Sequence, residues 1–524
     1  MAKKLQIVLL TLALGMGPVS FVNAKEVKLV GAEGGTGNRQ LAVDIVAGTV
    51  IVGAHAENYA KIYAVRNNRW NMQAQVSEAE GSFGWAVAIG SLNLRGNPHA
   101  AIVGAPNNND RGDSAGAAFV YAPSGGTWKQ QSKLTAADAA ATNNFGHAVS
   151  IDGNTAIVGS PKNDDAGKNS GAAYIFVRDG ARWKQQAKLL PKDLGGSDAF
   201  GDDVFVYGRT AVVGAPQHSH SGLRFPGAAY VFVREGETWV QKAKLTADDA
   251  AKSDRFGHSV AMSGNTIVVG APLHDTPAGK DAGVAYIFVL DGDSWKQQAM
   301  LMPAKAGASN QLGFGVATTG NIAIGGAPAR NEGARAAGAA YSFVRVEGAW
   351  VEKEKVVPKD GARDLKFGSS IGMSDNSVVI SSHNAVNEGP GFANGTAAYV
   401  YSSIEDFGTP PFSVNPSGLA VTTLGQIKRT ALFQNFPNPF NPETWLPYRL
   451  ASDAPVILRI YNVVGKLVRE LDLGDQRAGD YLTRETAGYW DGRDQHGEVV
   501  SSGLYVYTLE AGAFQATRKL IVLK

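Results

Sequence analysis

The sequence predicts an all-β protein, with a seven-bladed β-propeller followed by a small antiparallel β-sandwich. A motif ending in Gly-Ala-Pro recurs at a nearly constant spacing, short strand patterns separated by glycine turns fill each repeat, and a different strand pattern begins near residue 431. The 524 residues include 63 glycines, and regularly placed glycines indicate tight turns and close backbone contacts rather than helices. A chain of this length is expected to form two or more structural units.

The repeat is clearest at the glycine of the Gly-Ala-Pro element. Successive copies of this glycine follow one another at nearly equal intervals, and a serine takes its place in the last copy. The marker positions are Gly53, Gly104, Gly159, Gly214, Gly270, Gly326 and Ser381. A period this constant indicates stacked units of supersecondary structure.

Each repeat has the pattern of four short strands. In the third copy these are residues 145–151, 155–158, 172–177 and 183–189. The turn at Asp179-Gly180 has the acidic-Gly chemistry of a tight hairpin. Four antiparallel strands, repeated seven times without a helical pattern between them, predict a propeller.

The domain boundaries follow from the limits of the repeat. The last repeat lacks a fourth strand, and residues 26–30 resemble the end of one, so we expect 26–30 to complete the last blade. The propeller is therefore predicted to span residues 25–403. Residues 404–430, rich in Pro and Gly, are predicted to be a linker, and residues 431–524 to be the sandwich.

Residues 1–24 have the layout of a secretory signal peptide. Lys3 and Lys4 precede an apolar run of residues 5–16, and cleavage is expected after Ala24. The alternative is a membrane anchor, but the run is shorter than the ~20 residues that a helix needs to span a bilayer, and no later segment is suited to span one. The absence of cysteine excludes disulfides and thiolate chemistry. A net charge of +2 gives no indication of nucleic acid or an anionic membrane as partner.

The recurring Phe-Gly and Gly-Ala-Pro elements resemble FG-GAP repeats, the blade motif of integrin α-chains and of many exported bacterial proteins. Phe-Gly occurs at Phe83, Phe145, Phe200, Phe256, Phe314 and Phe367. Integrin-type blades carry a calcium loop between their first two strands, whereas here that turn is as short as Asp152-Gly153-Asn154, too short to surround a calcium ion. No cofactor is therefore predicted, although calcium elsewhere in the loops stays an open alternative.

Propeller topology places the long polar loops of every blade on one face, where a ligand is expected to dock. The candidate ligand-binding residues are Asp110, Asp113, Asp164, Asp165, His218, His220, His274, Asp275, Arg330 and Asn331. The alternative is that such Asp and Asn side chains cap their own loops. The histidines are interpreted as solvated loop residues rather than zinc ligands. The integrin-ligand tripeptide Arg111-Gly112-Asp113 is interpreted as an ordinary turn.

Residues 431–524 resemble the C-terminal sorting domain of type IX secretion cargo and the related Ig-like domain of flagellar hook-capping proteins. The residues that carry the resemblance are Pro437, Asn438, Pro439, Phe440, Asn441, Pro442, Trp490, Asp491, Gly492, Gly503, Tyr505 and Lys519. The resemblance implies contact with the secretion machinery and passage through the outer membrane. The alternative is an Ig-like module without a role in transport.

Together these features predict a monomeric binding or adhesion protein, secreted or held on the cell surface of a Gram-negative-type bacterium, with an extracellular protein or glycan as ligand. No nucleophile motif, phosphate loop or metalloprotease motif occurs, so no enzymatic activity is expected. Two alternatives stay open: a secreted polysaccharide hydrolase or lyase that uses the same face, and a structural component of the envelope or matrix.

Overall fold

The computed structural model describes residues 25–32, 38–39, 41–66, 69–91, 99–180, 182–332, 335–346, 348–359, 364–374, 377–382, 384–385, 396–402, 430–433, 435, 443–463, 465–477, 479–481, 486–512 and 514–522. The predicted signal peptide, nearly all of the predicted linker and the motif at 437–442 lie outside these residues. The chain divides into two compact units, Met1–Phe407 and Gly408–Lys524. Every regular element in the described part is a β-strand, and that part contains no helix able to cross a membrane.

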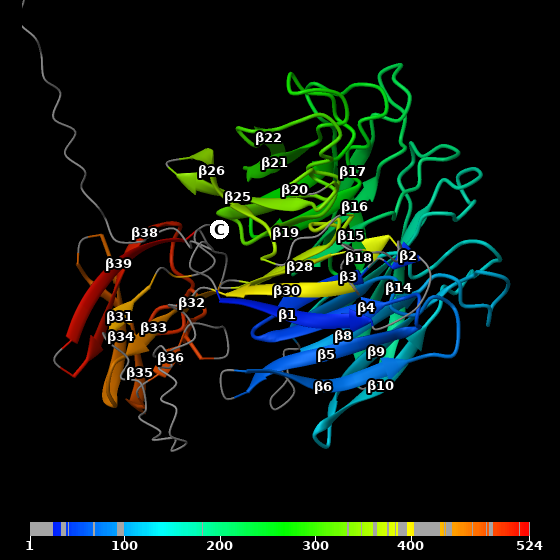
Figure 1. Ribbon diagram of the computed structural model, residues 1–524. Helices are drawn as coiled ribbons and strands as arrows, with labels where there is room; N and C mark the ends of the chain where they lie inside the picture. The colour runs from blue at the N-terminus through cyan, green and yellow to red at the C-terminus, as the bar shows by residue number, and fades with distance from the viewer. Residues whose placement is uncertain are drawn as a thin grey trace, which may run out of the picture. The chain divides into compact units, whose positions relative to one another are not determined.

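The first unit contains seven four-stranded antiparallel sheets (Figure 1). Blade 1 consists of β3 (Leu41–Val46), β4 (Thr49–Ala54), β5 (Tyr59–Arg66) and β6 (Arg69–Ser77). Blade 2 consists of β7 (Val87–Ser91), β8 (His99–Ala105), β9 (Ala117–Ser124) and β10 (Thr127–Leu134). Blade 3 consists of β11 (Val149–Asp152), β12 (Thr155–Ser160), β13 (Ala172–Asp179) and β14 (Arg182–Leu189). Blade 4 consists of β15 (Val204–Tyr207), β16 (Thr210–Ala215), β17 (Ala228–Glu235) and β18 (Thr238–Leu245). Blade 5 consists of β19 (Ser259–Ser263), β20 (Thr266–Ala271), β21 (Val284–Asp291) and β22 (Ser294–Leu301). Blade 6 consists of β23 (Val316–Thr318), β24 (Ile322–Ala327), β25 (Ala339–Val346) and β26 (Ala349–Val356).

The seventh blade joins the two ends of the unit. Its strands are β27 (Ile371–Ser374), β28 (Ser377–Ser381), β30 (Thr396–Ser402) and, outermost, β1 (Lys25–Ala32). Figure 1 shows β1 in blue beside β30 in yellow, and Val27 pairs with Val400 in an antiparallel register. This is the pairing predicted for residues 26–30. The short strands β2 (Asn38–Arg39) and β29 (Asn384–Ala385) also pair.

The ring is closed, because each innermost strand contacts the innermost strand of the next blade, and β27 contacts β3. Side-chain oxygens on the inner strands accept hydrogen bonds from backbone N–H groups of the following blade. Ser150 accepts from Val206 at 3.1 Å, and Ser370 accepts from Val43 at 3.2 Å, which joins the seventh blade to the first. The predicted seven-bladed propeller is confirmed.

The Phe-Gly and Gly-Ala-Pro elements hold neighbouring blades together. Gly159 is the last residue but one of β12, and a Cβ atom at this position would lie 2.1 Å from the carbonyl oxygen of Gly201 in the next blade. Only glycine fits such an approach. The Phe of Phe-Gly precedes the strand rather than starting it: Phe145 is fully buried against Tyr174 and Phe176, and β11 begins at Val149.

The sixth copy of Phe-Gly differs from the sequence prediction. Leu312-Gly313, not Phe314-Gly315, takes the structural position of Phe-Gly: Leu312 bridges Gly283, and the Gly313 carbonyl lies against Gly270. Leu312 also precedes Gly326 by the same interval that separates Phe145 from Gly159. The hairpin turns are likewise shifted by one position, because Glu235 pairs with Thr238 across a loop that starts at Gly236.

The second unit is an antiparallel sandwich. Its strands are β31 (Ala431–Leu432), β32 (Thr444–Leu446), β33 (Tyr448–Leu450), β34 (Ala454–Asn462), β35 (Leu467–Gln476), β36 (Gly479–Tyr481), β37 (Gly488–Trp490), β38 (Gly503–Ala511) and β39 (Phe514–Val522). The main sheet has the order β35-β34-β38-β39, and two smaller sheets pair β31-β33-β36 and β32-β37. Buried side chains from all three sheets form one core, which includes Trp490, Tyr448 and Tyr507.

Candidate functional site

The long loops after the second strand of a blade lie beside the loops that connect successive blades. This contact repeats around the ring as a backbone hydrogen bond. The N–H of Thr142 donates to the carbonyl oxygen of Asp113 at 2.6 Å, that of Ser197 to the carbonyl of Lys168 at 2.7 Å, and that of Ser309 to the carbonyl of Lys280 at 2.7 Å. In each pair the donor belongs to a connection between blades and the acceptor to a long loop. The two sets of loops therefore form one face of the propeller, which we call the loop face.

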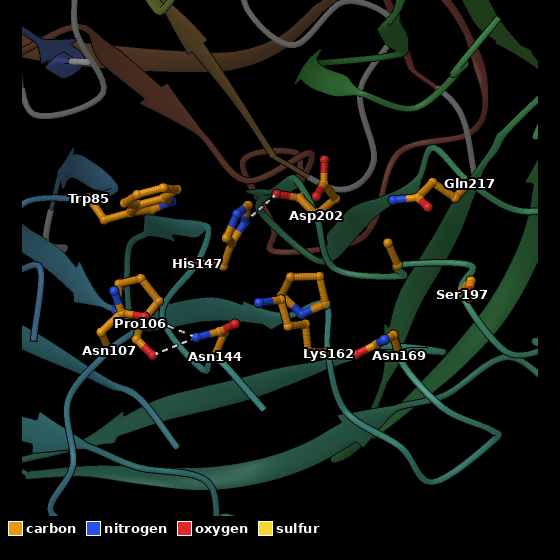
Figure 2. A pocket seen from close by; sticks show the side chains of 12 residues that line it. Trp85, Pro106, Asn107, Asn144, His147, Lys162, Asn169, Ser197, Asp202 and Gln217 are labelled. Carbon is orange, nitrogen blue, oxygen red and sulfur yellow. Dashed lines mark hydrogen bonds between the residues drawn. The ribbon is translucent and has the colours of Figure 1, made fainter. Parts of the chain in front are cut away.

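A pocket of about 500 Å³ opens on the loop face across blades 2, 3 and 4 (Figure 2). It lies among loops of both sets, before β7, β11 and β15 and after β8, β12 and β16. Its lining residues are Trp85, Pro106, Asn107, Asn144, His147, Pro161, Lys162, Asn169, Ser197, Ala199, Asp202 and Gln217. This volume falls in the usual range for small-ligand sites.

Two repeated positions supply six of these twelve residues. The residue after Phe-Gly supplies Trp85, His147 and Asp202, and the residue after the Pro of Gly-Ala-Pro, or of its Gly-Ser-Pro variant, supplies Asn107, Lys162 and Gln217. The buried phenylalanine and the close-packed glycine fix the backbone on each side. The variable residue next to each motif is therefore held rigidly at the pocket.

One wall of the pocket is ordered by contacts within the protein. The Trp85 ring packs against His55 at 4.8 Å and His147 at 5.5 Å between ring centres. The Nδ1 atom of His147 lies 3.1 Å from the Asp202 carbonyl oxygen, as Figure 2 shows. The Asp202 carboxylate lies 3.8 Å from Nδ1 of His258. Trp85 remains 38% exposed, so part of its side chain is available to a ligand.

The amide side chains beside this wall are also oriented. Asn144 donates to the Pro106 carbonyl at 3.0 Å and to Oδ1 of Asn107 at 3.2 Å, and Asn107 donates to the Ser82 hydroxyl at 2.9 Å. This wall thus presents polar groups in fixed positions, an arrangement that reduces the entropy lost when a ligand binds.

The ten residues predicted to bind ligand lie outside the pocket lining, and each is engaged within its own part of the loop face. Asp110 and Asp165 form ion pairs with lysines of the outermost strands, Lys133 and Lys188. Arg330 pairs with Glu332 at 3.0 Å.

The other acidic and amide candidates close their own loops. Oδ1 of Asp164, Asp275 and Asn331 accepts the backbone N–H of Asn169, Asp281 and Ala336, respectively, at 2.7 to 2.8 Å, and Asp113 accepts the Ser114 hydroxyl. This is the capping alternative considered from the sequence.

Two of the predicted loop histidines are buried rather than solvated. His218 and His274 are 3% and 7% exposed, with Nδ1 at 2.6 Å from Asp198 and 3.0 Å from Asp254. They take the position of Asn108 and Asn163 in other blades, which are also buried. The solvated interpretation was wrong for both, because this loop position points into the blade.

His220 lies in the same loop as His218. Its Nε2 is 3.1 Å from the Gly227 carbonyl, and burial lowers its pKa. Within the described part of the chain, no group of three or more His, Cys, Asp or Glu side chains is placed to hold a metal ion.

The tripeptide at Arg111-Gly112-Asp113 is part of the repeated loop geometry. Gly112 has a φ of 131°, and Gly167 and Gly279 occupy the same place in their loops with φ values of 128° and 133°. The glycine is thus explained by a backbone conformation that other residues avoid.

In the second unit, the described residues of the predicted sorting motif form a turn and part of the core. The buried Trp490 ring donates from Nε1 to the Arg493 carbonyl at 2.8 Å, and Asp491 accepts the Arg493 N–H at 3.1 Å. Gly492 and Gly503 have positive φ, and the Tyr505 hydroxyl donates to the Ser501 carbonyl. Lys519 is exposed on β39. These contacts explain the motif structurally and leave Lys519 accessible.

The comparisons with known proteins agree with these two units. Residues 128–176, 183–232, 239–288 and 350–401 match the FG-GAP repeat, and residues 444–513 match the FlgD Ig-like domain. No curated protein matches the chain. One similar solved structure is PorZ of the oral bacterium Porphyromonas gingivalis, described as an essential surface component of the type-IX secretion system, at 12% identity and a TM-score of 0.40. The alignment covers 92% of this chain and 59% of PorZ, so the chain spans less than two thirds of that protein's length. The chain carries FG-GAP repeats followed by a FlgD Ig-like domain.

Proposed function

We propose that this protein is an exported binding protein whose propeller holds an extracellular ligand in the loop-face pocket. The observation that carries the proposal is the pocket itself, with a Trp85 wall fixed by its neighbours and polar side chains from three blades around it. A rigid scaffold that presents variable loop residues around a concave site is a common design for recognition.

The chemistry of the lining supports binding rather than catalysis. The lining residues include a single carboxylate, Asp202, whereas glycoside hydrolysis uses a pair of carboxylates across the bond that is cleaved. The lining also contains four amide side chains, the Ser197 hydroxyl and the Trp85 ring, which suit hydrogen bonding and stacking. The pocket lining thus contains no second acidic residue that a hydrolase or lyase could use together with Asp202.

Export is supported by the amino-terminal sequence, because residues 1–24 have the layout of a signal peptide. We extend the proposal to a secreted or surface location and to a sorting role for the C-terminal domain. Fusing residues 431–524 to a periplasmic reporter, in a host with type IX secretion, tests that role. Sorting predicts an extracellular reporter, and a reporter retained in the periplasm would contradict it.

The binding proposal is tested on an array of extracellular glycans and proteins. We expect the purified chain to bind at least one component, and the Trp85→Ala variant to lose that binding. Tyr207→Ala is the matched control, because Tyr207 is a comparably exposed aromatic residue at the far end of β15, outside the pocket. Absence of binding, as expected of a purely structural component, or equal binding by Trp85→Ala, would overturn the proposal.

A further inference from the structure

The polar side chains of the pocket form two groups that differ in their hydrogen bonding. Asn107, Asn144 and His147 have partners within the protein, as described above. The side chains of Lys162, Asn169, Ser197 and Gln217 form no hydrogen bond or ion pair among the described residues, although all four line the pocket. Figure 2 shows Asn169, Ser197 and Gln217 on one side of Lys162, and Trp85 on the other.

These unpartnered groups define the polarity of a matching ligand. An amide offers both donors and acceptors, a hydroxyl offers both, and a lysine ammonium offers donors only. A ligand that satisfies Asn169, Ser197 and Gln217 together must itself carry several groups that donate and accept. Saccharide hydroxyls have this property.

The partly exposed Trp85 side chain adds a second requirement. Its indole ring is flat and largely apolar, it lines the pocket, and Figure 2 shows it on the other side of Lys162 from Asn169 and Ser197. The C–H face of a pyranose ring is flat and apolar while its rim is hydroxylated, so one sugar can stack on Trp85 and reach the polar side chains from its edge. A peptide of mixed sequence offers no such regular combination.

Lys162 indicates the charge of the ligand. Four lysines of the outermost strands, Lys133, Lys188, Lys244 and Lys355, each form an ion pair with a loop carboxylate. Lys162 is the lysine that lines the pocket. Lys162 forms none among the described residues. Asp202, the carboxylate of the lining, has His258 as its neighbour instead. The pocket therefore holds a cation whose counter-ion the ligand can provide.

We propose that the loop-face pocket binds an acidic saccharide, with one sugar stacked on Trp85 and its negative charge on the ammonium group of Lys162. This inference rests on the proposed binding function and specifies its ligand class. A carboxylate or a sulfate ester can supply the charge. Asn169, Ser197 and Gln217 hydrogen-bond the hydroxyls.

The test is a calorimetric titration of the full chain with fragments of polygalacturonate, alginate and carrageenan. Each is compared with its neutral counterpart, made by reduction of the carboxylates or removal of the sulfates. We expect at least one acidic fragment to bind, and its neutral counterpart to bind about tenfold more weakly, the effect of losing one charge-assisted hydrogen bond. Lys162→Gln is expected to bind the acidic fragment as weakly as the wild type binds the neutral one.

Lys168→Gln is the matched control, because Lys168 is an exposed residue of the same loop that does not line the pocket. It is expected to bind as the wild type does. Equal binding of acidic and neutral fragments, or equal losses in the two lysine variants, would overturn the acidic assignment. In that case loss of binding in Trp85→Ala would leave the proposed function standing. If no saccharide binds, the inference fails, and the protein part of the array decides separately whether the proposed function fails with it.

Discussion

Oδ2 of Asp203 accepts a hydrogen bond of 2.7 Å from the backbone N–H of Val260, which belongs to the next blade of the ring. Its Oδ1 accepts the N–H of Val204 at 2.9 Å. Asp44 makes the same arrangement between blades 1 and 2, through Ile45 and Ile89. Burial raises the pKa of both carboxyls to about 7, against the opposing effect of these hydrogen bonds.

The raised pKa of Asp203 predicts a stability that falls as the pH rises. The folded chain binds this proton more tightly than the unfolded chain, whose value is 3.8, so the stabilisation is complete below that pH and is lost as the pH rises through about 7. Asp203→Asn should therefore show a smaller decrease in the free energy of unfolding between about pH 5 and about pH 8. Urea unfolding at several pH values measures how steeply the free energy of unfolding falls with pH. Asp291→Asn, on an exposed hairpin, is the control, and equal slopes for wild type and Asp203→Asn would contradict the prediction.

His274 has a pH dependence of different origin. Burial by itself lowers the pKa of His274, but the hydrogen bond to Asp254 and the charges of Asp254 and Asp249 raise it above 6.5 overall. The resulting stabilisation is present below 6.5 and is lost as the pH rises through the folded value. His274→Asn introduces the residue found at this position in blades 2 and 3. Its melting temperature should fall further below that of the wild type in acid than in alkali. A constant difference would show that His274 does not titrate as described.

The contact between Gly159 and Gly201 predicts a sharp limit on side-chain size. Gly159→Ala places a methyl group 2.1 Å from the Gly201 carbonyl, so the blades must move apart. We expect a loss of about 2–4 kcal/mol in the free energy of unfolding. Gly195→Ala is the control, since the nearest atom to its new Cβ is 3.9 Å away and its φ is not positive. Chemical denaturation compares the two, and similar small losses would show that the blades are not in this close contact.

Closure of the ring by β1 predicts that its buried face is required for stability. Leu29 is 6% exposed and packs in the core between the seventh and first blades. Leu29→Asn is expected to destabilise the protein by about 2–5 kcal/mol, and Lys28→Asn on the other face of the strand by much less. Thermal unfolding compares the variants. Early proteolytic removal of residues 25–32 from an otherwise intact chain would also argue against closure by this strand.

The propeller was predictable because its physical requirements repeat. Each blade needs a glycine where two backbones meet and a buried aromatic beside it, so the same letters recur at the same spacing. The sixth copy was misassigned because Leu312 replaces the aromatic residue and Phe314 follows shortly after it. The constant interval to the Gly-Ala-Pro glycine identifies Leu312, since the backbone contact depends on Gly313 and not on the phenyl ring.

The pocket was predictable only in part. The loops that line it were identified, but the residues chosen within them were the most charged ones, and those are used by ion pairs and loop caps. Lys162 and Gln217 each follow directly after the proline of the motif, and their side chains line the pocket. His218, the next residue after Gln217, points into the blade and is buried against Asp198. Alternation of side-chain direction next to a fixed motif was the available signal.

The assignment of the pocket is decided by the dissociation constants of wild type, Trp85→Ala and Tyr207→Ala for an array component that the wild type binds. We expect Trp85→Ala to raise the dissociation constant about tenfold or more, on the order of one removed aromatic contact, and Tyr207→Ala to leave it unchanged. A dissociation constant unaffected by Trp85→Ala would show that the ligand docks elsewhere and would contradict the assignment of the pocket.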